Sequence, residues 1–396
     1  MSQANQSESS TAPSAGGGVF KKVVAAVLIL LLAVVAYFLA VPSPIDPVAY
    51  EPPPQREMSG VLEPNHALDK TEVLAAEEVE GPEDVDVDGQ GRIYGGGVDG
   101  RIVRVSPDGS VETFANTGGR PLGLDFDAGG NLIVADGTKG LLSIDAEGRI
   151  TSLVVAVADM PLGFTDDVMV SRDGVIYFSD ASSKFGPGEF MDDMLESRPH
   201  GRLIRYDPAT KKADVLLDDL YFANGVALSA DEDFVLVNET WRYRITRYWL
   251  KGPRAGESDV FIDRLPGFPD GVSRDDEGTF WLAIFTLRND TADMLAGRPF
   301  LKKMLTKLPA FMLPKPVPYG LVLAIDEEGQ IVRSLHGPPG TPYCPITSVE
   351  HRDGYLYLGS LTHRGIGRLK LDRSSAAANG EHPQPPRDDR SAEKND

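Results

Sequence analysis

Oxygen-bearing side chains recur at one repeated place in this sequence, just where a short apolar strand begins. They are Glu83 in GPEDVDV, Asp166 and Asp167 in FTDDVMV, Asn224 in FANGVAL and Asp270 in FPDGVSR. Ca²⁺ binds about six to eight oxygens, and carboxylates, amide carbonyls and water all serve. If these strands converge on one axis, Glu83, Asp166, Asn224 and Asp270 predict a single site for a divalent cation, with Ca²⁺ as the ion.

Turn formation is the alternative explanation, because Asp and Asn favour the loops that precede strands. Glu83 is a poor turn former, however, and similar residues recur at the same place, which favours the ion site. Asp136, in LIVADGTKG, is open to two interpretations. It is either a general base at the same site or a cap for the turn that follows it.

A repeated hairpin must position these residues. Each copy has an alternating strand, a turn rich in Asp and Gly, and a second strand with aromatic or β-branched residues. Six copies begin at Asp84, Leu124, Val168, Val226, Gly271 and Val349, and their turn aspartates are Asp88, Asp127, Asp173, Asp231, Asp276 and Asp353. Further strands follow each hairpin, which is typical of a propeller blade and less so of a β-sandwich. The expected fold class is therefore all-β, a six-bladed β-propeller.

The two ends of this repeat region are expected to close the ring. The sixth unit lacks a fourth strand, and a free strand candidate at 71–79 precedes the first unit. This N-terminal strand should complete blade six and leave no open sheet edge. The propeller is expected over 66–372, with insertions near 182–201 and 285–320 that overhang one ligand-binding face.

The N-terminal region predicts a membrane anchor. An apolar stretch at 23–41 follows Lys21 and Lys22, and at about 1.5 Å per residue it crosses the hydrocarbon layer as a helix. No A-x-A motif follows, so it predicts a single-pass transmembrane signal anchor, with a cleaved signal ending near Ala40 as the alternative. Residues 1–22 would then be cytoplasmic and the propeller extracytoplasmic, in the periplasm or in the lumen or extracellular space. The Pro-rich linker 42–65 is expected to be an extended spacer, and the tail 373–396 to be disordered.

Charge and cysteine content exclude some classes of function. With 39 Lys and Arg against 59 Asp and Glu, the net charge is −20, which repels the phosphates of nucleic acids. The single cysteine, Cys344, leaves no internal disulfide and no thiolate cluster, so any metal ligands should be oxygens.

A basic amphipathic helix is expected at 299–313, within the second insertion. Its apolar residues have helical spacing, its lysines lie off that face, and Ala310-Phe311-Met312-Leu313 continue the apolar character. The apolar residues are Phe300, Leu301, Met304, Leu305 and Leu308, and the lysines are Lys302, Lys303 and Lys307. The pattern indicates either a contact with a membrane surface or a lid packed on the propeller, and the two are compatible.

Several of these motifs together resemble a known family. The runs GPED, FTDDV, FANGV, GFPDG, IYFSDASSKF and LYLGS resemble the strictosidine synthase-like branch of the senescence marker protein, gluconolactonase and paraoxonase superfamily, over about residues 60–372. The resemblance implies a six-bladed propeller and, in the hydrolytic branches, a divalent cation on its axis, usually calcium. It also implies that Glu83, Asn224 and Asp270 are ligands.

The sequence departs from that family at three kinds of position. Asp166 stands where Asn is common, which adds a carboxylate to the ligand set. Gly271 stands where paraoxonases have a second amide ligand, which leaves that place to water. Leu122 and Asp136 occupy the positions of the paraoxonase histidine pair, so proton transfer through histidine is not expected.

The leading hypothesis is a metal-dependent hydrolase of lactones or activated esters. The cation would polarise the carbonyl, and Asp270 or Asp136 would take a proton from the attacking water. One alternative is an amine–aldehyde condensing enzyme, as in true strictosidine synthases, which do not need this ligand set. The other is a non-catalytic binding or scaffold propeller with a structural ion. The expected partners are a small ester or lactone and the membrane, with no nucleic acid and no organic cofactor.

Overall fold

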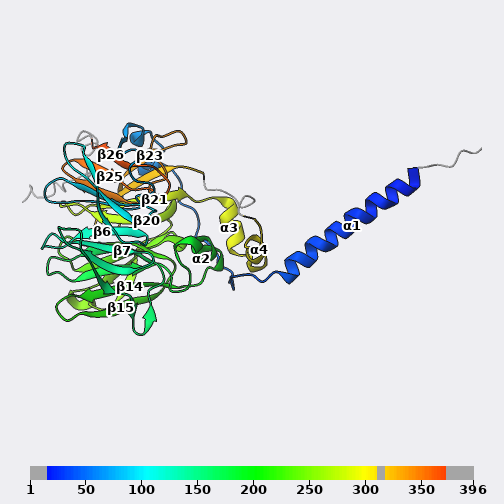
Figure 1. Cartoon of the computed structure of the whole chain (residues 1–396), viewed down its shortest axis with the longest axis horizontal. Coiled ribbons are helices and arrows are strands. Elements are labelled where there is room, and N and C mark those ends of the chain that lie inside the picture. Colours follow the sequence, from blue (N-terminus) through cyan, green and yellow to red (C-terminus); the bar gives the residue numbers. More distant parts are fainter. Residues whose placement is uncertain (1–15, 310–316, 372–396) are drawn as a thin grey trace, which may run out of the picture.

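The structure is a computed structural model that describes residues 16–309 and 317–371. Within these residues, six antiparallel sheets of four strands each form the blades of a propeller (Figure 1). The expected six-bladed β-propeller is therefore confirmed. Residues 1–15, 310–313 of the expected basic helix, and the tail 373–396 lie outside the described residues.

Blades one to three follow one another along the chain. Blade one contains β2 (Val85–Val87), β3 (Ile93–Gly96), β4 (Arg101–Val105) and β5 (Val111–Asn116). Blade two contains β6 (Pro121–Phe126), β7 (Leu132–Asp136), β8 (Gly140–Ile144) and β9 (Ile150–Val154). A small hairpin of β10 (Ala156–Val157) and β11 (Met160–Pro161) leads to blade three. Blade three contains β12 (Thr165–Val170), β13 (Ile176–Asp180), β14 (Gly201–Asp207) and β15 (Lys212–Leu220).

Blades four to six complete the ring. Blade four contains β16 (Ala223–Leu228), β17 (Phe234–Glu239), β18 (Arg244–Trp249) and β19 (Ser258–Ile262). Blade five contains β20 (Gly267–Arg274), β21 (Phe280–Leu287), β22 (Gly320–Ile325) and β23 (Ile331–Gly337). Blade six contains β24 (Val349–Arg352), β25 (Tyr355–Leu358), β26 (Ile366–Lys370) and β1 (Glu72–Leu74).

Strand β1 closes blade six as expected, although it is shorter than 71–79. It pairs antiparallel with β26, with Glu72 opposite Arg368 and Leu74 opposite Ile366. The strand ends at Leu74 because the chain then turns, and Ala75 and Glu77 have positive φ angles of 49° and 67°. The closure leaves no free edge at this point of the ring.

Aspartates organise several of the hairpin turns, and in blade four Ser229 has this role. Asp88 Oδ1 accepts hydrogen bonds from the N–H groups of Gln90 and Arg92 at 2.9 and 3.0 Å, which fixes the turn between β2 and β3. In blade five this role belongs to Asp275, which accepts from Glu277 and Thr279. The predicted Asp276 lies in the same turn but is exposed, and the neighbouring Asp275 makes the hydrogen bonds.

The hydrophobic core lies between adjacent blades. For example, Leu124 and Leu132 of blade two pack against Tyr94 and Ile102 of blade one, and all four are buried. Because each blade buries both faces against its neighbours, the inner strands are held at fixed positions around the axis.

Helices lie on one side of the propeller. α1 (Gly16–Ala40) projects away from it, on the side where α2 (Phe190–Glu196), α3 (Asp290–Ala296) and α4 (Pro299–Leu305) lie (Figure 1). Its segment Gly18–Phe38 is, within the described residues, the one helix long and apolar enough to cross a membrane. α2 lies in the first insertion, α3 and α4 lie in the second, and α4 contacts both of the other two. Short 3-10 helices occur at Gly60–Leu62, Ala67–Lys70, Pro187–Glu189, Thr240–Arg242 and Gly252–Arg254.

The segment 41–62, which we call the strap, is extended but bound to the propeller. The N–H of Val48 donates to the carbonyl of Glu196 at 3.1 Å, and that of Tyr50 to the carbonyl of Ala296 at 3.0 Å. Ile45 and Leu62 are 4% and 2% exposed. The linker expected at 42–65 is therefore not a free spacer, because both the backbone and the apolar side chains of the strap find partners on the domain.

Helix α4 also differs from its prediction. It ends at Leu305, and Lys302, expected on the outer face, is 1% exposed. Its Nζ donates to the carbonyl of Val48 at 2.9 Å and to Ser197 Oγ at 2.8 Å. Phe300, expected on the packed face, is 71% exposed. Contacts with the strap therefore decide which side of α4 faces the propeller.

Candidate functional site

The four predicted ligands come together at the end of the axis where the inner strands begin. Glu83 precedes β2, Asp166 lies in β12, Asn224 in β16 and Asp270 in β20. Each is 4 to 6% exposed. Asn224 Nδ2 donates to Asp270 Oδ1 at 2.7 Å, and the charges of Asp166 and Asp270 act on Glu83. Residues from blades one, three, four and five thus form one buried polar cluster.

Irregular strand pairing aims these side chains at the axis. The register shifts between Thr165 and Val168 in β12, between Ala223 and Val226 in β16, and between Pro269 and Val272 in β20. Side chains of a regular strand alternate between its two faces, whereas a bulge redirects one of two neighbours. The shift in β12 allows both Asp166 and Asp167 to lie near the axis.

Residues that sequence reasoning missed hold the backbone of the cluster. Thr347 Oγ1 donates to the carbonyl of Glu83 at 2.6 Å, and Thr240 Oγ1 to that of Pro269 at 2.8 Å. Asn238 Nδ2 donates to the carbonyl of Asp270. The only signal for Asn238 and Thr240 in the sequence is the polar end of an apolar strand, in FVLVNET.

Close packing explains why position 271 is a glycine, a reason that the sequence alone did not reveal. A Cβ atom at this position would lie 2.8 Å from the carbonyl oxygen of Thr347 and 3.1 Å from Ser348 Cβ. Blade six therefore packs directly against the backbone that follows Asp270. An amide side chain at position 271 has no room unless the inner strand moves.

Burial and mutual repulsion raise the pKa values of the acidic residues. Burial is the main cause for Glu83 and Asp166, and the charge of Asp270 raises the pKa of each further, well above the ordinary range. Burial raises the pKa of Asp270 to about 7, against the opposing effect of the Asn224 hydrogen bond. Arg120, also missed from the sequence, lowers the pKa of Asp166 through its charge. Its guanidinium is held by the carbonyls of Gly81 and Gly96 at 2.8 and 3.1 Å.

The chemistry of this cluster fits a hard divalent cation. In the described parts of the chain, no group of three or more His, Cys, Asp or Glu side chains is already arranged to hold a metal. All donors are nevertheless oxygens, and a cation would relieve the repulsion between Glu83, Asp166 and Asp270. The bond from Asn224 Nδ2 to Asp270 leaves the amide Oδ1 as the ligand atom.

Asp136 caps a turn, and it is fully enclosed. Its Oδ1 accepts from the N–H groups of Arg120, Thr138 and Lys139 at 2.9, 3.0 and 3.0 Å, which matches the second of its two interpretations. Its Oδ2 has no hydrogen-bond partner in the described residues, and the residue is 0% exposed. Leu122, at the other position of the expected histidine pair, is buried among aromatic side chains.

A separate cavity of about 230 Å³ is lined by residues that directly follow three of the predicted ligands, Asp84, Asp167 and Gly271, and by further acidic side chains such as Asp125. Asp84 Oδ2 accepts from the N–H of Leu124 at 2.8 Å, and Asp167 Oδ2 from that of Val226 at 2.7 Å. In blade two, Asp125 Oδ2 likewise accepts from the N–H of Val170 in blade three. Each of these carboxylates joins the inner strand of one blade to that of the next, so Asp167 has a structural role distinct from Asp166.

Aromatic residues and α2 form a roof near the cluster. Phe164 and Phe222, each two residues before a predicted ligand, pack together with ring centroids 5.4 Å apart, and Trp241 packs on Phe222 at 4.6 Å. Trp241 Nε1 donates to Asp193 Oδ1 of α2 at 2.8 Å. Phe190, the first residue of α2, packs against the same aromatic group. An apolar group therefore adjoins the strand starts that carry Asp166 and Asn224.

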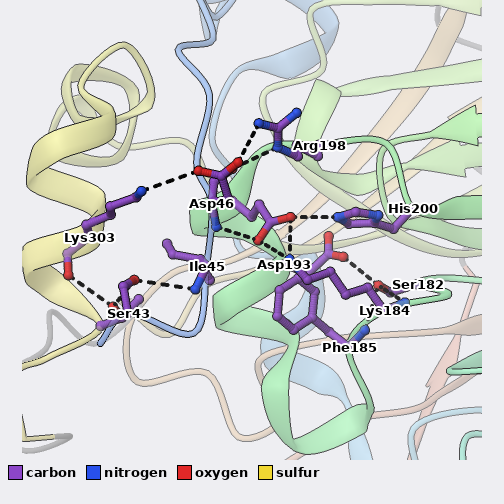
Figure 2. A network of polar contacts seen from close by, with 12 residues as sticks. Ser43, Ile45, Asp46, Ser182, Lys184, Phe185, Asp193, Arg198, His200 and Lys303 are labelled. Atoms are coloured by element: carbon purple, nitrogen blue, oxygen red, sulfur yellow. Dashed lines mark hydrogen bonds and ion pairs between the residues drawn. The ribbon is translucent and has the colours of Figure 1, made fainter. Parts of the chain in front are cut away.

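The strap fixes α2 from its outer side. Asp46 lies between Arg198 and Lys303 (Figure 2), and it accepts hydrogen bonds from them at 3.0 and 3.3 Å. Glu196 accepts from Lys184 at 2.7 Å and pairs with His200 at 2.9 Å. The N–H of Asp46 also donates to Glu196 Oε2 at 2.9 Å. The roof is thus tied to the segment that leads to α1.

Comparisons with solved structures bear on the fold. A gluconolactonase from Xanthomonas campestris has a TM-score of 0.57 at 20% identity, over 84% of this chain and 99% of that one. The calcium-binding protein regucalcin from Agrobacterium tumefaciens has a TM-score of 0.52 at 16% identity, over 76% and 91%. At these identities the likeness shows a shared propeller.

Comparisons of sequence find relatives with higher identity than these solved structures. The strictosidine synthase family matches residues 166–253, and the N-terminal part of strictosidine synthase-like proteins matches 60–105. Adipocyte plasma membrane-associated protein of Rattus norvegicus is 38% identical over 83% of this chain and 93% of its own length. Strictosidine synthase-like 4 of Arabidopsis thaliana is 39% identical over 70% and 76%. The chain therefore belongs to the strictosidine synthase-like family, together with the adipocyte plasma membrane-associated proteins.

Proposed function

We propose that this protein is a membrane-anchored, metal-dependent hydrolase of lactones or activated esters. The observation that carries the proposal is the buried cluster of Glu83, Asp166, Asn224 and Asp270 at one end of the axis. A divalent cation bound there, Ca²⁺ by preference, would act as a Lewis acid on a substrate carbonyl. The fold shared with a gluconolactonase and with a calcium-binding regucalcin supports this choice.

Asp270 is the stronger candidate for the proton acceptor. Burial raises its pKa to about 7 in the cluster without an ion, and a bound cation would lower this pKa and keep Asp270 as a carboxylate that can accept a proton from a neighbouring water. Asp136 is the weaker candidate because its Oδ1 is occupied by three backbone N–H groups and the residue is enclosed. We assign Asp136 to hold the turn that follows β7 and the backbone of Arg120.

The apolar roof favours a substrate with an apolar part. Phe164, Phe222 and Trp241 would contact the acyl chain or the ring carbons, while the polar cluster faces the carbonyl. Such walls bind apolar groups and exclude water from the reacting centre.

The location of the protein is part of the proposal. Gly18–Phe38 can cross a membrane, and Lys21 and Lys22 lie toward its N-terminal end. Positive charge favours the cytoplasmic side, so the propeller would be extracytoplasmic. Protease digestion of intact vesicles tests this arrangement through protection of the propeller.

A substrate screen with a matched variant tests the function. Full-length protein in detergent is assayed with lactones and aryl esters, with added Ca²⁺ or with a chelator. We expect turnover that the chelator removes, loss of turnover in Asp270→Asn, and normal turnover in Asp276→Asn, whose side chain is exposed at the opposite end of blade five. No turnover with any divalent metal would refute the hydrolase and leave a binding propeller. Chelator-insensitive condensation of an amine with an aldehyde would indicate the other alternative.

A further inference from the structure

Helix α4 presents an apolar surface that the described residues leave exposed. Phe300 is 71% exposed and Leu301 is 38% exposed. Among residues 41–309 and 317–371, Phe300 is the one aromatic side chain that is exposed. Met294 on α3, which packs beside α4, is 47% exposed. Burial of a phenylalanine side chain contributes about 1.5–3 kcal/mol, so this surface would gain free energy from an apolar environment.

The same helix is fastened to the end of the membrane-crossing segment. Lys307 Nζ donates to the carbonyl of Phe38 at 2.6 Å, and the hydroxyl of Tyr37 donates to the carbonyl of Lys307 at 2.8 Å. Ser43 and Thr306 share a hydrogen bond of 3.1 Å. These contacts place the end of the α4 segment at the level where the apolar helix leaves the hydrocarbon layer.

The distance between these contacts and Phe300 is short. Lys307 is seven positions after Phe300, and the helical part from Phe300 to Leu305 extends over about 8 Å at about 1.5 Å per residue. The headgroup region adds roughly 5–8 Å on each side of the hydrocarbon layer. Helix α4, which carries Phe300, lies on the side of the propeller from which α1 departs (Figure 1), so Phe300 is within reach of the headgroup region.

Charge on this surface is mixed, and Lys307 adds a positive charge whose hydrogen-bond partner is a backbone carbonyl. Lys302 is buried beneath it, and Lys303 is paired with Asp46 at 3.3 Å. Arg298 and Asp290 are exposed with opposite charges. With a lipid that has no net charge, such as phosphatidylcholine, electrostatic attraction is weak and apolar contact is the main contribution to binding.

We propose that α3 and α4 rest on the bilayer that α1 spans, with Phe300 and Leu301 inserted in its interfacial region. The occupant of this surface is the lipid of the leaflet on the propeller side. The strap then does not tether a freely tumbling domain; it holds one end of the propeller against the membrane. This arrangement does not depend on the proposed hydrolase activity.

Depth-dependent quenching in the full-length protein tests the proposal. Phe300→Cys in a Cys344→Ser background is labelled with an environment-sensitive fluorophore and reconstituted in phosphatidylcholine vesicles, with and without a brominated-chain phosphatidylcholine. Ile150→Cys is the matched control, since Ile150 is 40% exposed and follows a turn at the opposite end of the propeller. Leu301→Cys is the second test position. We expect quenching several-fold stronger at 300 and 301 than at 150, and unchanged in high salt.

Two results would overturn the proposal. Equal quenching at 300, 301 and 150 would show that α4 does not contact lipid. Quenching at 300 that disappears in high salt would show that charge, and not apolar insertion, holds this surface to the bilayer. The melting temperature of each labelled variant in detergent is compared with that of the parent protein to check that the fold is intact. Substitution of an exposed residue such as Phe300 should leave the melting temperature unchanged.

Discussion

Lys302 offers a test of how the strap is held. Burial lowers the pKa of this ammonium group from 10.5 to about 8, while its Nζ donates to Val48 and Ser197. At 1.36 kcal/mol per pKa unit, holding the charged form costs the folded state about 3 kcal/mol at neutral pH. A neutral amine still donates both hydrogen bonds, so the folded state does not bear this cost at high pH.

The sign of the pH effect follows from proton binding. Between about pH 8 and pH 10.5 the unfolded chain carries a proton on Lys302 that the folded chain has lost. The free energy of unfolding therefore rises with pH across this window. Lys302→Met has no such group. We expect the difference in unfolding free energy, wild type minus Lys302→Met, to increase by about 3 kcal/mol from about pH 7 to about pH 10.5.

Urea unfolding of both proteins in parallel measures this difference. Other lysines and tyrosines titrate in the same window, but they cancel because both proteins contain them. Lys303→Met is the control, since its side chain is 43% exposed and its curve should parallel that of the wild type. Parallel curves for Lys302→Met and the wild type would refute the assignment of a buried, charged Lys302.

The remaining predictions concern the ion, the inner strands and the strap. Ca²⁺ at about 100 times its Kd should stabilise the protein by about 2.7 kcal/mol, and Asn224→Ala should abolish the rise in Tm seen by differential scanning fluorimetry; an equal rise in the variant would contradict the ligand assignment. Gly271→Asn should lower the unfolding free energy by about 1–3 kcal/mol because its Cβ meets Thr347, whereas Gly89→Asn, with open space around it, should not. Ile45→Ala should cost about 2–5 kcal/mol of strap docking and expose 41–62 to limited proteolysis, and wild-type cleavage rates would show that Ile45 does not hold the strap.

The propeller and the cluster were predictable because both rest on local repetition. Each hairpin carries its own turn signals, and one place in each copy lies near the axis, so Glu83, Asn224 and Asp270 could be compared directly. Where two candidates were adjacent, the pattern was ambiguous. Asp275 and Asp276 are an example, since only the hydrogen bonds to Glu277 and Thr279 decide between them.

Features that depend on distant partners could not be predicted. A Pro-rich composition predicts an extended backbone, but it does not reveal that Asp46 meets Glu196, 150 residues away. Lys302 lies off the apolar spacing of its helix, and its buried position depends on Val48, 254 residues away. In the same way, Gly271 looked like a missing ligand until the neighbouring blade was in place.

The pairing of β1 with β26 has a consequence for folding. Arg368 and Glu72 form a hydrogen bond at 2.7 Å across 296 residues of chain. Closing a loop of that length costs about 5 kcal/mol of chain entropy, and high contact order slows folding. Since α1 and β1 are synthesised first and β26 last, the membrane anchor is in place while β1 has no partner. We expect the ring to be sealed only after the complete propeller has emerged.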